Sequence, residues 1–438
     1  MRKTDNTSRQ EPETLSARAP TETALDTGAD TGADRLPPRL FAPYLASAVA
    51  LAMSYGSSFL LSDALRAAGY PASTAGAVVS AGTVATLIGS LAAGRLAERA
   101  GILPLVVASA AIMAVAMACF ALIGVGGLSL AYAGGLLLGL GWAVFYMLAP
   151  LQLIHCLRPA ARLEALTLLS GSQMLGIGLS APLGRAVSGA FGGPAHAYAC
   201  YAAFCALAAV LCLAIRKRMA DQPQLPMRAV ALSVPSILSI LRARTLAPVL
   251  MIGVAACTFA GLSTFQGLYA ASRGTTPDIF FLAFTITTVA LRFSVASMIG
   301  RLPLVRLALA LFVATLLGIG LLAINEKSRI LYAVATILFA TGYGLTYSTL
   351  NAMVVNLAGE RGLSIPAASQ VFTLGYFVGL FGFPFIAGSV IAVYGIDAAL
   401  LVMVGLVMAN IAGACWISRR DRAEAERMSG RRAARIRR

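Results

Sequence analysis

Long runs of apolar residues alternate with short polar segments from about residue 40 to residue 418. A helix that crosses a membrane needs about 20 consecutive apolar residues. The stretch has room for about twelve such helices with their connections, so we predict an all-α polytopic membrane protein. The predicted spans are 40–62, 73–96, 103–125, 128–151, 164–188, 195–215, 246–271, 278–300, 303–324, 330–355, 365–393 and 397–418.

The polar segments divide the chain into regions. The longest internal one, residues 216–245, follows the sixth span and is predicted to be a cytoplasmic central loop between two halves of six spans, residues 40–215 and 246–418. Residues 1–39 are polar and are predicted to form a disordered tail. Residues 419–438 form a basic tail, which is either solvated or in contact with anionic lipid head groups.

The composition agrees with a membrane protein and excludes other classes. Hydrophobic residues make up 58% of the chain and charged residues 12%, whereas soluble domains carry about 25% charged residues. This much apolar surface cannot be buried in a soluble core, which excludes a soluble enzyme. The net charge of +16 does not indicate nucleic-acid binding, because the basic residues do not cluster on a soluble face.

The positions of the basic residues predict the orientation. Of the 34 Lys and Arg residues, 28 lie in the tails and in the connections on the same side as the tails, and 5 lie on the other side. Cytoplasmic connections retain basic residues, so both termini are predicted to be cytoplasmic. Only three basic residues are lysines, which together with the alanine richness is typical of a high-GC bacterial genome. We therefore expect a bacterial inner membrane.

The two halves repeat each other in places. The segment 94–106 at the end of the second span has a shortened echo, 299–305, at the end of the eighth. The fifth and eleventh spans each carry a Ser-Gln pair near the start, several glycines, and a proline in the outer half, Pro182 and Pro384. Repeated halves with interrupted spans in corresponding places are typical of secondary transporters, whose site lies between the halves.

The connection between the second and third spans carries the sequence Gly-x-Leu-Ala-Glu-Arg-x-Gly. It resembles the loop signature of the major facilitator superfamily, G-x-L-A-D-R-x-G, which implies that family's twelve-helix fold and a loop that latches the inner gate. The residues of this gate motif are Gly94, Leu96, Glu98, Arg99 and Gly101.

A latch of this kind needs an acid that faces a helix N-terminus. The partner expected here is the eleventh span, which begins with Ser364 as a cap and Pro366 in its first turn. The acid is Glu98 rather than aspartate, and Ile102-Leu103 replaces the family's basic pair. We therefore expect a weak latch; an ordinary charged turn is the alternative.

The fifth span contains Gly178, Pro182 and Gly184, which resemble the family's antiporter motif and imply export. Small residues at this spacing also serve plain helix packing. The fourth span has Gly135 where the family's pattern has an arginine. This departure leaves the family's usual proton-transfer arrangement incomplete.

Arg292 is the one charged residue well inside a span. An ionisable side chain at this depth is costly and therefore suggests a function. It either binds an anionic group in a central cavity or extends toward the inner interface and braces the gate. No carboxylate lies well inside a span, which disfavours a cationic substrate.

Polar and aromatic side chains at helical spacing are the other substrate-binding candidates. Each of them could instead serve helix packing. They are Gln173, Gln370, Trp142, Tyr146, Gln266, Tyr269, Tyr343, Tyr347 and Asn351.

Taken together, the sequence predicts a secondary active transporter of the efflux branch that exports a small polar or anionic metabolite in exchange for protons. A siderophore-like compound or an antibiotic would fit the candidate residues. A solute uptake symporter is the first alternative, and a non-transporting receptor or membrane-embedded enzyme the second. We expect a monomer without catalytic residues, metal site, nucleic-acid partner or cofactor, driven by the proton gradient, because the phosphate-binding motif of ATPases is absent from the sequence.

Overall fold

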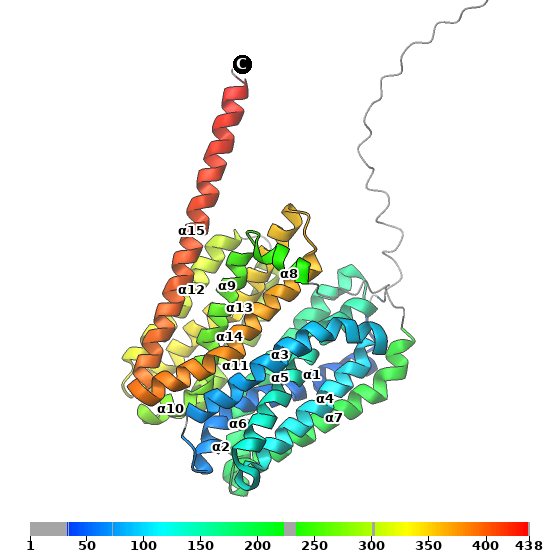
Figure 1. The fold of residues 1–438 in the computed structure, drawn as a ribbon, viewed down its shortest axis with the longest axis vertical. Coiled ribbons are helices and arrows are strands. Elements are labelled where there is room, and N and C mark those ends of the chain that lie inside the picture. Colours follow the sequence, from blue (N-terminus) through cyan, green and yellow to red (C-terminus); the bar gives the residue numbers. More distant parts are fainter. Residues whose placement is uncertain (1–32, 34, 72, 223–233, 300–302, 437–438) are drawn as a thin grey trace, which may run out of the picture.

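Helices make up almost all of the described chain. The computed structural model describes residues 33, 35–71, 73–222, 234–299 and 303–436. Among these residues there is no strand, and one isolated bridge joins Ala33 to Leu157. Figure 1 shows one bundle of long helices, from which the last helix projects. The predicted all-α class is confirmed.

The described residues of the first half contain one 3-10 helix, η2, within the first span. Its elements are α1 (Pro38–Gly56), η2 (Ser57–Leu60), α2 (Leu61–Ala67), α3 (Ser73–Ala100), α4 (Ile102–Ala121), α5 (Ile123–Cys156), α6 (Pro159–Phe191) and α7 (Pro194–Ala220). The second half follows the short helix α8. Its elements are α8 (Val234–Leu241), α9 (Leu246–Thr264), α10 (Gln266–Ser272), α11 (Asp278–Ile299), α12 (Leu304–Ile324), α13 (Arg329–Glu360), α14 (Ile365–Tyr394) and α15 (Ile396–Ile436).

The predicted spans correspond to these helices. Eleven spans among the described residues are long and apolar enough to cross a membrane, and α11, with 22 residues, occupies the predicted eighth span. Large apolar side chains such as Val84, Ile88 and Phe293 are exposed on the outside of the bundle. A lipid environment would cover them, because exposed apolar patches of this extent are rare on soluble monomers.

Several helices continue beyond the apolar runs. α5 extends to Cys156, α7 to Ala220 and α15 to Ile436. Hydropathy marks only the apolar core of a span, whereas helical hydrogen bonds continue through polar residues. Part of the predicted central loop and most of the basic tail are therefore helical. The predicted tail 1–39 and the loop segment 223–233 lie mostly or wholly outside the described residues.

The two ends of the bundle are distinguished by the helices that begin and end there. We call the end where α1 begins and α3 ends the terminal end, and the end where α2 ends and α11 begins the distal end. In Figure 1 the distal end, with α2 and α10, lies in the lower part of the view.

The first span of each half is broken at a similar place. α1 has 19 residues and leads through η2 into the seven-residue helix α2. α9 also has 19 residues and leads through Phe265 into the seven-residue helix α10. This match supports the pseudo-symmetry of the halves.

The halves pack on each other through α3 with α14 and α6 with α11. Glycines allow this close approach. A β-carbon at Gly76 would collide with the carbonyl of Pro384, and one at Gly178 would collide with Thr285. The Ser80 hydroxyl donates a hydrogen bond to the carbonyl of Gly382 at 3.1 Å, so polar contacts reinforce this packing.

Candidate functional site

Arg292 lies in the middle of the interface between the halves. It is on α11, and one guanidinium nitrogen donates a hydrogen bond to the hydroxyl of Ser170 on α6. Its Nε is buried without a hydrogen-bond partner, and it forms no ion pair with any described carboxylate. A buried cation whose partners are neutral is costly, and an anionic group beside Arg292 would lower that cost.

Four tyrosines from both halves surround this arginine. Tyr146 on α5, Tyr343 and Tyr347 on α13, and Tyr376 on α14 all lie close enough to its guanidinium to sense its charge. We call them the tyrosine cluster. The hydroxyl of Tyr343 donates to that of Tyr376 at 3.4 Å, and the rings of Tyr146 and Tyr376 stack with centroids 6.1 Å apart. The cluster therefore joins the first half to the second.

Other aromatic rings extend the tyrosine cluster toward the distal end. Trp142 stacks on Tyr55 with ring centroids 4.5 Å apart and lies 5.5 Å from the ring of Tyr146. On the other side Tyr343 stacks on Phe259, also at 4.5 Å. The positive charge of Arg292 is thus embedded in aromatic surface, which can hold the planar parts of an organic molecule.

Three hydrogen-bond donors in this region are buried without acceptors among the described residues. They are Nε1 of Trp142, Nε2 of Gln173 and Nε of Arg292. Gln173 lies one turn along α6 from Ser170, the hydrogen-bond partner of Arg292. Buried polar groups are normally paired, and all three groups here are donors. The partner that would satisfy them is an acceptor.

Two predicted residues lie one turn nearer the terminal end. Asn351 on α13 accepts a hydrogen bond from the hydroxyl of Ser369 on α14 at 3.1 Å. Gln370, the neighbour of Ser369, is half-buried. They line the same α13–α14 seam as Tyr347, whose hydroxyl lies 3.1 Å from that of Thr373.

Gln266 and Tyr269 lie elsewhere. Both are on α10, beyond the break at Phe265. The Tyr332 hydroxyl donates to Oε1 of Gln266 at 2.6 Å, and the Tyr269 hydroxyl donates to the carbonyl of Leu322 at 2.8 Å. Tyr332 precedes Tyr343 by about three turns of α13, or about 16 Å. The structure therefore places Gln266 and Tyr269 in a packed distal network and not beside Arg292.

The sequence reasoning missed three residues of the site: Ser170, Tyr376 and Tyr55. Tyr376 could have been found, because Ser369, Thr373 and Tyr376 recur at helical spacing on α14. Ser170 and Tyr55 gave no such signal, since their role depends on how α6 and α1 are rotated in the bundle.

Ion pairs hold the halves together at the distal end. Arg185 on α6 donates to Asp278 on α11 at 2.7 Å, and its Nε lies 3.9 Å from a carboxylate oxygen of Asp63 on α2. Its guanidinium also lies over the ring of Phe281, 5.4 Å from the centroid. A second ion pair, Arg273 with Asp397, joins α10 to α15 within the second half.

The gate motif lies at the terminal end, where α3 turns into α4. Gly101 forms this turn with φ of +83°, a conformation that favours glycine. Glu98 is exposed and forms no hydrogen bond or ion pair with a described residue. Ser364 caps α14 as expected by accepting from the N–H of Ala367 at 3.4 Å. The latch between Glu98 and α14 is therefore not formed in this structure.

The three residues of the antiporter-like motif lie along α6. Gly178 abuts Thr285 of the other half, Gly184 abuts Leu60 and Tyr201, and Pro182 is inside the helix. The two glycines serve close packing in this conformation, one between the halves and one within the first half.

The described links between the halves run from the distal ion pairs to the tyrosine cluster. Of the ring contacts between the halves, those nearest the terminal end join Tyr146 to Tyr347, Tyr376 and Phe377. They lie about three turns from the terminal ends of their helices. The interface is thus fastened at the distal end and in the middle.

The comparisons with known proteins agree with this architecture. The sequence model of the Major Facilitator Superfamily matches residues 44–380. The chain belongs to the major facilitator superfamily. Its members are multi-pass membrane transporters, so the chain is a transporter of small molecules rather than an enzyme.

A solved member of the superfamily has the same fold. The chain is similar to the crystal structure of a mutant of the nucleoside transporter NupG, with a TM-score of 0.68 and 13% sequence identity. The match covers 86% of this chain and 99% of that one. No curated protein matches the chain by sequence. At this identity the likeness extends to the fold alone.

Proposed function

We propose that this transporter moves a small anionic solute by alternating access and binds it between the halves at Arg292. The observation that carries this proposal is the set of three buried donors, from α5, α6 and α11, that lack acceptors. One of them is a cation, and its hydrogen-bond partner within the protein is a hydroxyl group. A carboxylate or a similar oxyanion bound at Arg292 would supply acceptors of the kind that these donors lack.

The aromatic surroundings narrow the class of solute. Trp142 and the tyrosine cluster offer ring faces beside the charge, so an acid with a planar aromatic part fits better than a simple inorganic anion. Siderophore-like chelators and acidic antibiotics have this chemistry. Lipophilic cations do not fit, because no described carboxylate pairs with the site.

Binding can be measured through Trp142 fluorescence. The chain has two tryptophans, so a Trp416→Phe background leaves Trp142 as the sole reporter within the site. The probe is 2,3-dihydroxybenzoate, a planar aromatic acid. A neutral nucleoside, the cargo named for the structural neighbour, serves as a planar probe without charge.

We expect Arg292→Gln to weaken binding of the acid about ten- to a hundredfold, because hydrogen bonds to charged groups contribute about 1.5–3 kcal/mol. Arg273→Gln is the matched control, since Arg273 is paired far from the site. Unchanged affinity in Arg292→Gln would remove this residue from the site. If Arg292→Lys restores transport while the affinity never changes, the arginine only braces the gate.

Export in exchange for protons is the proposed direction and coupling. The support is the Gly178, Pro182 and Gly184 pattern on α6, which resembles the antiporter motif. Proteoliposomes with an imposed pH gradient separate this from uptake by symport. An antiporter moves the acid against the proton flow, and a symporter moves it in the same direction. Binding without movement in either gradient would favour a non-transporting receptor.

We further propose a bacterial inner membrane with both termini in the cytoplasm, so that the distal end faces outward. The support is the 28 to 5 distribution of basic residues. Reporter fusions at Ser129 and Glu326 should report the outside and a fusion at Pro223 the inside. A reversed pattern at any of the three would overturn the orientation. A monomer is proposed, since the two halves of one chain enclose the site.

A further inference from the structure

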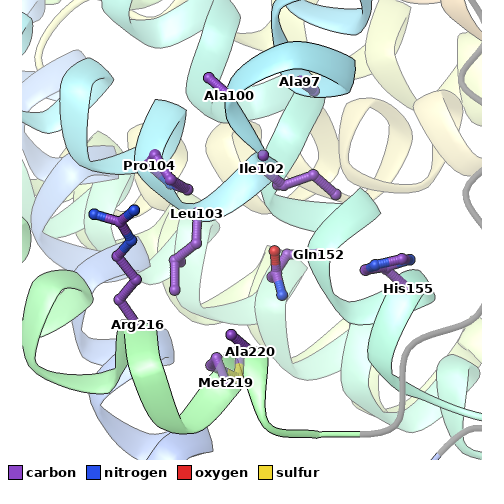
Figure 2. A pocket seen from close by; sticks show the side chains of 11 residues that line it. Ala97, Ala100, Ile102, Leu103, Pro104, Gln152, His155, Arg216, Met219 and Ala220 are labelled. Carbon is purple, nitrogen blue, oxygen red and sulfur yellow. The ribbon is translucent and has the colours of Figure 1, made fainter.

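A cavity of about 330 Å³ lies at the terminal end, within the first half and away from Arg292. It is enclosed by the end of α3, the first turn of α4, and the last turns of α5 and α7. Figure 2 shows its lining, with Arg216 rising from α7 toward Leu103 and Pro104 of α4, and with Gln152 and His155 on α5. This volume suits a small organic molecule or a lipid head group.

The polar groups that line the cavity are basic or neutral. Arg216, His155 and Gln152 are the polar side chains among its lining residues, and no carboxylate is among them. Arg216 forms no ion pair with a described residue. Gln152 is 5% exposed, and its side-chain amide donates a hydrogen bond to Sγ of Cys156 at 3.3 Å. The lining therefore carries the positive charge of Arg216, an exposed side chain that no described residue neutralises.

The first turn of α4 adds to this positive potential. Gly101 is its N-cap residue and provides no side-chain cap. No described residue accepts a hydrogen bond from the backbone N–H of Ile102 or Leu103, and such groups at a helix N-terminus attract anions. α5 and α7 present their negative C-terminal ends here, and Arg216 in the last turns of α7 offsets the end of that helix.

The rest of the lining is apolar. Ile102 and Leu103 are each 5% exposed and Met219 is 1% exposed. A ligand with a charged group and an aliphatic part would contact both kinds of surface. The cavity also lies at the end of the spans, at the depth where the head groups of a bilayer are found.

We propose that this cavity binds a phosphate group with net negative charge, as carried by the head group of an acidic phospholipid or by free phosphate. Arg216 and the first turn of α4 hold the phosphate, and Gln152 and His155 complete the polar lining. Because Ala97, Ala100 and Gly101 also line the cavity, the bound group contacts the loop that carries the gate motif. This site is independent of the solute site at Arg292.

Calorimetric titration of the full-length protein in an uncharged detergent tests the proposal. The probes are dihexanoyl phosphatidylglycerol, dihexanoyl phosphatidylcholine and inorganic phosphate. We expect the anionic lipid to bind with higher affinity than the zwitterionic one. If inorganic phosphate binds as tightly as the anionic lipid, the source is free phosphate; if the lipid alone binds, the source is the membrane.

Arg216→Gln should weaken binding of the effective probe about ten- to a hundredfold. Arg218→Gln is the matched control, because it removes the same charge two residues away, outside the lining. Ala100→Trp fills the cavity at an exposed position while leaving Arg216 in place, and should abolish binding. Three results would each overturn the proposal: phosphatidylcholine that binds as tightly as the effective anionic probe, equal effects of the two arginine variants, or binding that survives Ala100→Trp.

Discussion

The distal and terminal ends of the bundle differ in how the two halves meet. At the distal end, Arg185 of the first half is paired with Asp278 of the second, and nearer the middle of the bundle Ser80 bonds to the backbone of α14. At the terminal end, the gate motif is present but Glu98 has no partner among the described residues. The interface between the halves is therefore closed by contacts at the distal end, whereas the predicted latch at the terminal end is not formed.

Because the two halves are joined by an ion pair at the distal end, the structure represents a conformation that is closed at that end. Alternating access requires that the two ends open in turn around a fixed site. A formed distal closure and an unformed latch belong to the same state of that cycle. An unpaired polar residue therefore need not be a ligand site, because the partner predicted for Glu98 is the N-terminus of α14, which Glu98 does not contact in this structure.

A covalent link across the distal end should have the largest effect. A β-carbon at Gly388 on α14 would lie 3.3 Å from the Cα of Ser73 on α3, which is close enough for a disulfide. We expect the oxidised Ser73→Cys, Gly388→Cys protein to lose transport almost completely, because the distal end can no longer open. The reduced protein and each single variant are the controls. Full transport with the link confirmed by peptide mapping would show that this end does not open.

Removing the distal ion pair should have a moderate effect. A partly exposed pair contributes about 1 kcal/mol or less, so Arg185→Gln should raise the distal-open population by up to about fivefold. Distances between spin labels at Ala68 and Thr276 would report the change. Arg273→Gln is the matched control, because its ion pair lies within one half. Equal shifts in the two variants would contradict a specific role for Arg185 in closing the halves.

Glu98→Gln should have an effect no larger than that of Arg185→Gln. An acid at a helix N-terminus contributes about 0.3–1 kcal/mol, so loss of the latch should slow transport by roughly two- to fivefold. The solute affinity should stay nearly unchanged, since Glu98 lies far from Arg292 along the bundle. Glu164→Gln, another exposed acid at the terminal end, is the control. A large loss of equilibrium binding with normal turnover would make Glu98 a ligand instead.

The sequence predicted the helices better than their ends. Hydropathy located the spans, because burial in lipid requires apolar side chains. It could not show that α15 continues to Ile436 through charged residues, because helix propensity and not hydropathy decides where such a helix stops. The break at Phe265 was also unpredicted, since neither proline nor glycine occupies that position.

The candidate-site residues that the sequence predicted were those that are costly to place within a span or that recur at helical spacing. Arg292 stood out because a charge within a span is expensive, and Tyr343 and Tyr347 because they recur at helical spacing. Gln266 and Tyr269 looked equivalent by these criteria, yet they lie in the distal network. Depth along a broken helix and rotation about its axis depend on contacts between distant segments, which local sequence patterns do not encode.

The matched breaks in the first span of each half bear on how the chain evolved. In each half the break follows a 19-residue helix and precedes a seven-residue one. A shared discontinuity is simplest to understand as an inheritance from one ancestral six-helix unit that was duplicated and fused. The break would then be older than the duplication. Asp63, which lies on α2 but has no acidic counterpart on α10, would mark where the two descendants later diverged.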